Sequence, residues 1–114
     1  MTQPSLNDAS SMQRAREIAL RTLAGDYDLL LACRDLSSLR GRLPGVSDGL
    51  MDVFLGVASE VDDLPIGAER NHWSAESLKR KDIEANDYQE RVREVVTGAL
   101  QGLLAALGGS SQAN

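Results

Sequence analysis

The sequence contains few of the residues from which covalent and metal-bound frameworks are built. Among its 114 residues there is one cysteine, Cys33, and one histidine, His72. A single cysteine excludes an intramolecular disulfide and suits a reducing cytoplasm. The Gly-x-Ser-x-Gly turn of serine hydrolases, the Glu-x-x-His pairs of di-iron bundles and the glycine-containing calcium loop are all absent. We therefore expect no cofactor, and we expect Cys33 to be an unreactive core residue.

Long apolar runs and an excess of positive charge are also missing. The longest apolar run is Leu29 to Cys33, far short of the roughly 18 residues that a membrane-spanning helix needs. Residues 1–11 are polar and predict no signal peptide. The net charge is −5 and the isoelectric point is about 4.7, so phosphate backbones and anionic lipids repel the chain. These features predict a cytoplasmic protein that binds neither nucleic acid nor membrane.

Leucine, by contrast, is abundant. The chain contains 17 Leu but only 7 Val and 3 Ile, within 42% hydrophobic and 25% charged residues. Leucine loses less rotamer freedom in a helix than β-branched residues do, so this aliphatic set favours helices. The length suits one domain, and apolar residues recur at intervals of three and four. We predict an all-α, antiparallel helical bundle of about four helices in residues 10–108, between disordered tails at 1–9 and 109–114.

Capping residues and helix breakers divide this bundle into its helices. Residues that can cap a helix N-terminus precede each apolar stripe: Ser10 or Ser11, Asp26 or Asp28, Ser47, and Ser74. Glycine or proline follows three of the stripes: Gly25, Pro44-Gly45, and Gly108-Gly109. The second stripe is Leu29–Leu43 and the third is Leu50–Val61, where Met51 and Leu55 widen the apolar face. Residues 53–58 also fit a short strand, but period-two alternation is absent and we predict helix.

The last predicted helix is much longer than the others. It begins after Ser74, ends near Leu107 and would measure roughly 50 Å at ~1.5 Å per residue. Its first three turns are mostly charged, so one end is expected to project from the bundle or to pack on a second copy. Gly98 and Gly102 lie on this helix, where each glycine costs about 1 kcal/mol relative to alanine. A close helix crossing would explain them, and one option is a homodimer through Gly98, Gly102 and Leu103.

Acidic residues gather before the last helix. Five acids and no base lie between Asp48 and Asp63, with Glu60, Asp62 and Asp63 close together. Carboxylates with a histidine can bind a divalent metal or share acid–base chemistry, so Glu60, Asp62, Asp63 and His72 are candidate metal ligands. The alternative interpretation is a helix C-terminus that runs into a solvated acidic loop.

The stretch from Ser59 to Trp73 resembles small bacterial proteins of unknown function. In those proteins a Ser-Glu-x-Asp-x-Leu-Pro-x-Gly-x-x-Arg-x-x-Trp run precedes a long charged helix, and this chain contains the same run. The stretch from Cys33 to Arg40 adds a less specific similarity. The resemblance implies a bacterial source and no particular activity. It also groups six residues as a unit: Glu60, Asp62, Pro65, Gly67, Arg70 and Trp73.

This unit has two interpretations. Arg70 would pair with Glu60 or Asp62 and Trp73 would cover the loop, or the same residues would present a binding surface. Because the chain has no catalytic motif, we predict a non-enzymatic protein that binds another protein, as a small regulator or an immunity-type inhibitor of a toxin. The predicted binding residues are Glu60, Asp62, Asp63, Arg70 and Trp73, since an acidic surface steers a basic partner. The alternative is a small metal-binding protein or metal-assisted enzyme.

Overall fold

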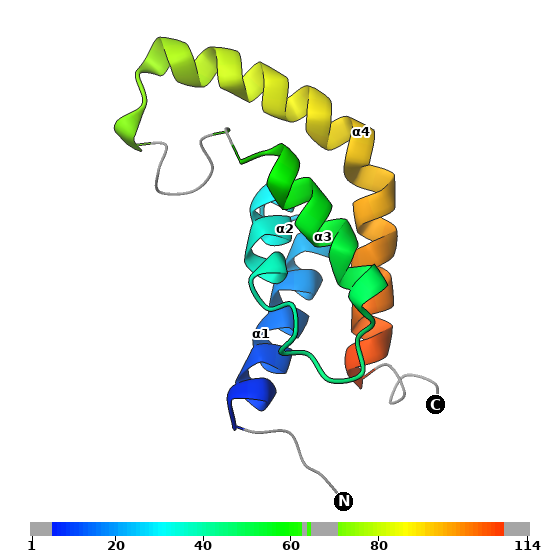
Figure 1. The fold of residues 1–114 in the computed structure, drawn as a ribbon. Helices are drawn as coiled ribbons and strands as arrows, with labels where there is room; N and C mark the ends of the chain where they lie inside the picture. Colours follow the sequence, from blue (N-terminus) through cyan, green and yellow to red (C-terminus); the bar gives the residue numbers. More distant parts are fainter. Residues whose placement is uncertain (1–5, 63, 65–70, 109–114) are drawn as a thin grey trace, which may run out of the picture.

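The computed structural model describes residues 6–62, 64 and 71–108, with side chains from Ala9 onward. Four helices follow one another: α1 (Leu6–Leu23), α2 (Leu29–Ser37), α3 (Asp48–Glu60) and α4 (Ala75–Gly108). No strand occurs among these residues, so the predicted all-α bundle with a long C-terminal helix is confirmed (Figure 1). None of the described helices combines the length and the apolar character needed to cross a bilayer.

The core lies around α2. This helix is the shortest of the four, yet it packs against each of the other three, while α1 and α3 both pack against α4. The largest fully buried side chains come from all four helices and the end of α3: Phe54, Ile18, Leu36, Met51, Leu100, Leu103, Val61, Val96 and Cys33. Burying an aliphatic or aromatic side chain of this size contributes about 1.5–3 kcal/mol relative to leaving it in water.

Helix α1 begins earlier than predicted. It starts at Leu6, so Ser10 and Ser11 lie inside the helix and neither is its N-cap. Ser11 is only 7% exposed because it lies on the same helical face as Ala15 and Ile18, which are four and seven residues further on. Part of the predicted tail at residues 1–9 is therefore helical, and residues 1–5 lie outside the described residues.

Helix α2 ends earlier than its apolar stripe. The helix stops at Ser37, whereas the stripe continues to Leu43. Two serine side chains at this end bond to the preceding turn: Ser37 Oγ donates to Arg34 O at 2.8 Å and Ser38 Oγ donates to Asp35 O at 2.6 Å. Such bonds compete with continued helix. Tight turns follow, and Leu43 is still buried at 5% exposure, so the apolar spacing continues beyond the helix.

Helix α3 follows the prediction at its start and departs from it on one face. Ser47 Oγ accepts the backbone N–H of Leu50 at 3.2 Å, as predicted for an N-cap, and residues 53–58 are helical as predicted. Phe54 is fully buried, but Leu55 is 42% exposed. Consecutive residues point about 100° apart around a helix, so Leu55 lies outside the core face. The prediction that Leu55 widens the apolar face is wrong.

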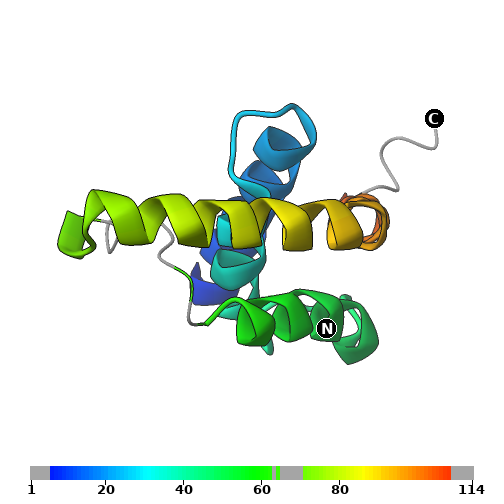
Figure 2. The same ribbon diagram turned by 90° about the horizontal axis from the view of Figure 1, so that it is seen from above.

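Helix α4 has two different halves. Ser74 caps it as predicted, with Ser74 Oγ accepting the Ser77 N–H at 3.1 Å. All buried side chains of this helix lie in its second half: Val96, Ala99, Leu100 and Leu103. Figures 1 and 2 show that the first half crosses over the ends of the other helices and extends past them. We call Ala75–Arg91 the arm, and it contains no buried side chain. With the arm extended in this way, the molecule is 55 Å long.

Of the two glycines in the middle of α4, Gly102 serves the packing of one chain. A Cβ at Gly102 would lie 3.3 Å from Leu50 Cδ1, so this glycine permits the close approach of α4 to α3. Leu103 has no exposed surface. Gly102 is half-buried against α3, and the predicted homodimer through Gly98, Gly102 and Leu103 stays a prediction. Gly98 is exposed, and a Cβ there would have no neighbour within 4 Å.

Replacing Gly98 with alanine is expected to raise the free energy of unfolding by about 0.5–1 kcal/mol. Alanine is the better helix former, and the added methyl group meets nothing. Urea denaturation measures the change. Gly25→Ala is the matched control with the opposite sign, because Gly25 has a φ of 88°, which disfavours any side chain. A destabilising Gly98→Ala change would show that another surface covers Gly98 in solution.

Candidate functional site

Two of the five predicted binding residues lie at the C-terminal end of α3. Glu60 is the last residue of the helix, and Asp62 follows in a turn in which its N–H donates to Ser59 O at 3.4 Å. Both acidic residues are exposed. Asp63 and Arg70 lie outside the described residues, so the predicted ion pair between Arg70 and this end of α3 stays a prediction.

His72 and Trp73 lie immediately before α4. Asn71 and His72 form a short 3₁₀ turn; His72 is exposed and Trp73 is 36% exposed, so the indole is partly covered. Within residues 6–62, 64 and 71–108, no three His, Cys, Asp or Glu side chains come close enough to hold a metal ion. The predicted metal set of Glu60, Asp62, Asp63 and His72 includes a residue outside this part of the chain, so it also stays a prediction.

The outer side of α3 carries a row of exposed residues. Asp48, Asp52, Leu55 and Ser59 follow at intervals of four, three and four, and Asp62 continues the row in the next turn. Residues at such intervals lie on one side of a helix. Leu55 is at the centre of the row, and α3 contains no basic residue. We call these five residues the acidic face.

A shallow hollow adjoins the acidic face where α2 meets α3. Its volume is about 410 Å³, and four residues line it: Arg34, Ala58, Ser59 and Asp62. Arg34 therefore brings a guanidinium close to one end of the acidic face. Near the other end, Arg40 donates to Asp52 Oδ1 from Nη2 at 3.0 Å and from Nε at 3.1 Å. An exposed pair of this kind contributes about 0–1 kcal/mol, so a partner can displace it.

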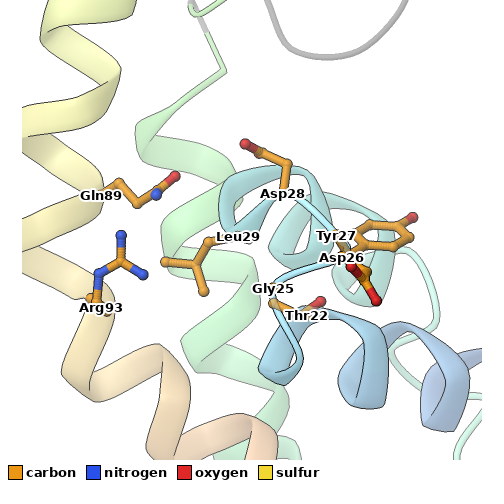
Figure 3. Close-up of a pocket in the computed structure, with 8 residues that line it drawn as sticks. All are labelled: Thr22, Gly25, Asp26, Tyr27, Asp28, Leu29, Gln89 and Arg93. Carbon is orange, nitrogen blue, oxygen red and sulfur yellow. The ribbon is translucent and has the colours of Figure 1, made fainter.

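A second cleft lies where the turn between α1 and α2 faces the middle of α4 (Figure 3). Its volume is about 380 Å³, and eight residues line it: Thr22, Gly25, Asp26, Tyr27, Asp28, Leu29, Gln89 and Arg93. Figure 3 shows Gln89 and Arg93 reaching from α4 toward Leu29. The positive φ of Gly25 allows the tight reversal that forms the opposite wall. The sequence alone does not predict this cleft, because its two walls are some sixty residues apart in the chain.

The charged groups of this cleft are largely occupied within the chain. Asp28 is the N-cap of α2, and its Oδ2 accepts the Leu31 N–H at 2.8 Å. Arg93 Nη2 donates to Glu90 Oε2 at 2.9 Å. A ligand that binds Asp28 would have to displace the N-cap of α2, so the acidic face is the stronger candidate for a binding surface.

The tyrosine of the same turn also serves the fold. Tyr27 OH donates to the carboxylate of Asp35 in α2, and the Arg21 guanidinium lies 5.4 Å from the centre of the Tyr27 ring. Burial and the hydrogen bond to Asp35 raise the pKa of the Tyr27 hydroxyl above its usual value. Arg14 Nη2 lies 4.0 Å from the same carboxylate. These contacts tie α1, the turn and α2 together.

Cys33 has the environment of a structural residue. Its side chain has no exposed surface. Burial, and to a smaller extent the negative charge of Asp28, raises the pKa of the thiol from 9.0 to about 12. A thiolate is the reactive form of cysteine, so Cys33 is not suited to act as a nucleophile. The prediction of a buried core cysteine is confirmed.

Comparisons with protein-family models, with curated proteins and with solved structures gave no match. The similarity of residues 59–73 to small bacterial proteins therefore stays a prediction.

Proposed function

We propose that this chain is a non-enzymatic protein that binds a basic protein partner through the acidic face of α3. In this proposal it is a small cytoplasmic regulator of bacterial origin or an immunity-type inhibitor. The single observation that carries the proposal is Leu55, which is 42% exposed in a row with three aspartates along a helix without any base.

The chemistry of this row suits a partner segment with both apolar and basic residues. Leu55 offers an apolar contact that the chain itself leaves open, and protein interfaces have an apolar centre surrounded by a polar rim. Asp48 and Asp62, at the two ends of the row, would attract Lys or Arg and speed the encounter. The overall charge of −5 favours a basic partner over an acidic one.

The helix that carries the acidic face is held in place by its buried side chains. Phe54 and Val57 point away from the acidic face, Met51 lies beside it, and all three are buried against the core. A helix that is fixed in this way loses little conformational freedom when a partner binds, which favours affinity. The neighbouring hollow lined by Arg34 and Asp62 gives the surface relief that a partner side chain can fill.

A capture experiment with matched variants tests this proposal. Wild type, Leu55→Asp and Asp62→Lys are immobilised and exposed to a bacterial extract, and retained proteins are identified by mass spectrometry. We expect at least one basic protein that the wild type retains and that both variants lose by about tenfold or more. Because charges contribute to the contact, raising the salt from about 0.05 M to about 0.5 M should release it.

Leu20→Asp is the control, since Leu20 is an equally accessible leucine on α1 with 51% exposure. This variant should retain the same protein as the wild type. If Leu55→Asp keeps every retained protein while Leu20→Asp loses one, the acidic face is the wrong surface. If all three variants and the wild type retain the same proteins, the proposed mode of binding is wrong.

A further inference from the structure

The outer side of the arm carries an ordered pattern of charge around one apolar residue. Glu76, Arg80, Ile83, Asp87 and Arg91 are all exposed, and they follow at intervals of four, three, four and four. This spacing places them along one side of α4. We call these five residues the outer stripe. Ile83, at its centre, is 60% exposed, the highest value among the large hydrophobic side chains described.

The order of charges along the outer stripe is acid, base, isoleucine, acid, base. When two such stripes run antiparallel about a two-fold axis close to Ile83, Glu76 faces Arg91 of the second copy and Arg80 faces Asp87 of the second copy. The two-fold axis repeats each pair, and the two Ile83 side chains meet at the centre. A parallel arrangement would instead place each charge opposite its own kind. The pattern is therefore complementary to itself in one orientation only.

The fold leaves these groups available. Within the described part of the chain, Glu76, Arg80 and Asp87 take part in no ion pair, and Arg91 contacts the Tyr88 ring at 5.7 Å. Figures 1 and 2 show that no other described helix lies on the far side of the arm. The arm packs on the core only through partly buried residues such as Ala85 and Tyr88, so a contact along its outer side would add to its stability.

We propose that two copies of this chain associate antiparallel along the outer stripes of their arms. The inference is independent of the acidic face, because α3 takes no part in it. The arm is about 25 Å long at ~1.5 Å per residue, which limits the contact to less than a standard protein interface. The association is accordingly weak, with a dissociation constant on the order of 0.1 mM.

Charge reversal with rescue tests this arrangement. Sedimentation equilibrium is recorded on the full chain from about 10 µM to about 1 mM. Arg80→Glu places two acids opposite each other, and Asp87→Arg places two bases opposite each other, so each variant should lose at least about tenfold in association constant. The double variant Arg80→Glu/Asp87→Arg exchanges the two charges and should associate as the wild type does.

A mixture of the two single variants provides the sharpest readout. Glu at position 80 of one chain then faces Arg at position 87 of the other, and Asp87 faces Arg80, so the mixture should associate although neither variant does alone. Arg42→Glu makes the same change of charge outside the arm and should leave the association unchanged. Leu55→Asp should also leave it unchanged, which separates this test from that of the acidic face.

The stripe residues are exposed, so the variants should keep the circular dichroism of the wild type. A wild type that remains monomeric at about 1 mM would overturn the proposal. So would a mixture of the two single variants that fails to associate while the wild type does, or an Arg42→Glu variant that loses association as strongly as Arg80→Glu.

Discussion

Replacing Phe54 with alanine is expected to lower the free energy of unfolding by about 3–5 kcal/mol, one of the two largest effects in this protein. Phe54 is the only phenylalanine of the chain and has no exposed surface. It lies on α3, which packs against both α2 and α4, so truncation leaves a cavity among three helices. Urea denaturation followed by circular dichroism measures the change, and a small domain has only about 5–15 kcal/mol to lose.

Leu55→Ala is the matched control for this experiment. Leu55 is the next residue of the same helix, but it is 42% exposed, so its truncation should cost less than about 1 kcal/mol. Equal losses in the two variants would mean that α3 is rotated about its axis relative to the core. That result would also remove Leu55 from the acidic face, so the comparison tests the orientation on which the proposed function depends.

Local signals were sufficient to predict most of the helices. The apolar intervals of three and four, together with the caps Ser47 and Ser74, predicted the start of α3 and of α4 correctly. These signals act within one turn of helix, so they operate whatever the rest of the chain does. The long C-terminal helix could also be predicted, because no proline interrupts residues 75–107 and the apolar intervals continue past Gly98 and Gly102.

The ends of α1 and α2 depended on interactions that periodicity does not reveal. Leu43 continues the apolar stripe of α2, yet turns carry it into the core after the helix has ended at Ser37. The spacing of apolar residues therefore predicts which side chains are buried more reliably than it predicts where the helix ends. At the start of α1, Ser11 was predicted to be an N-cap, but it lies inside the helix. A small hydroxyl residue can occupy either position, so its presence does not locate the helix start.

The candidate site was predictable in part. Asp62 was found from the clustering of acids in the sequence, together with Glu60, which lies outside the acidic face. Leu55 was missed because its neighbours in the sequence made it look like part of the core face. Which side of α3 meets solvent is decided by α2 and α4, and this information is not contained in the segment itself. The cleft formed by Gly25 and Arg93 was missed for the same reason.

The second large effect is a loss of stability at alkaline pH that depends on Cys33. The pKa of this thiol is about 12 in the folded chain and 9.0 in the unfolded chain. The unfolded chain therefore loses the proton first as the pH rises. The buried neutral thiol therefore contributes to the free energy of unfolding. This contribution is fully present below about pH 9 and is lost as the pH rises toward about 12.

The size of this effect follows from the shift. At a pH about 1.5 units above the thiol pKa of the unfolded chain, the free energy of unfolding is lower by about 2 kcal/mol, since each pH unit corresponds to about 1.4 kcal/mol. Burial also raises the pKa values of Tyr27 and Tyr88, so the wild type should lose stability through these groups as well. A variant that lacks the thiol is needed to separate the contribution of Cys33.

Cys33→Ala supplies that separation. At neutral pH it should be less stable than the wild type by about 1–2 kcal/mol, because the lost sulfur leaves a small cavity. Both proteins retain the tyrosines, so only the wild type carries the cysteine contribution to the pH dependence. Between about pH 8 and about pH 10.5 the wild type should lose about 2 kcal/mol more than Cys33→Ala in urea denaturation, which removes or reverses its advantage. Parallel pH dependences would contradict the prediction, because they would require the thiol of Cys33 to titrate as freely in the folded chain as in the unfolded one.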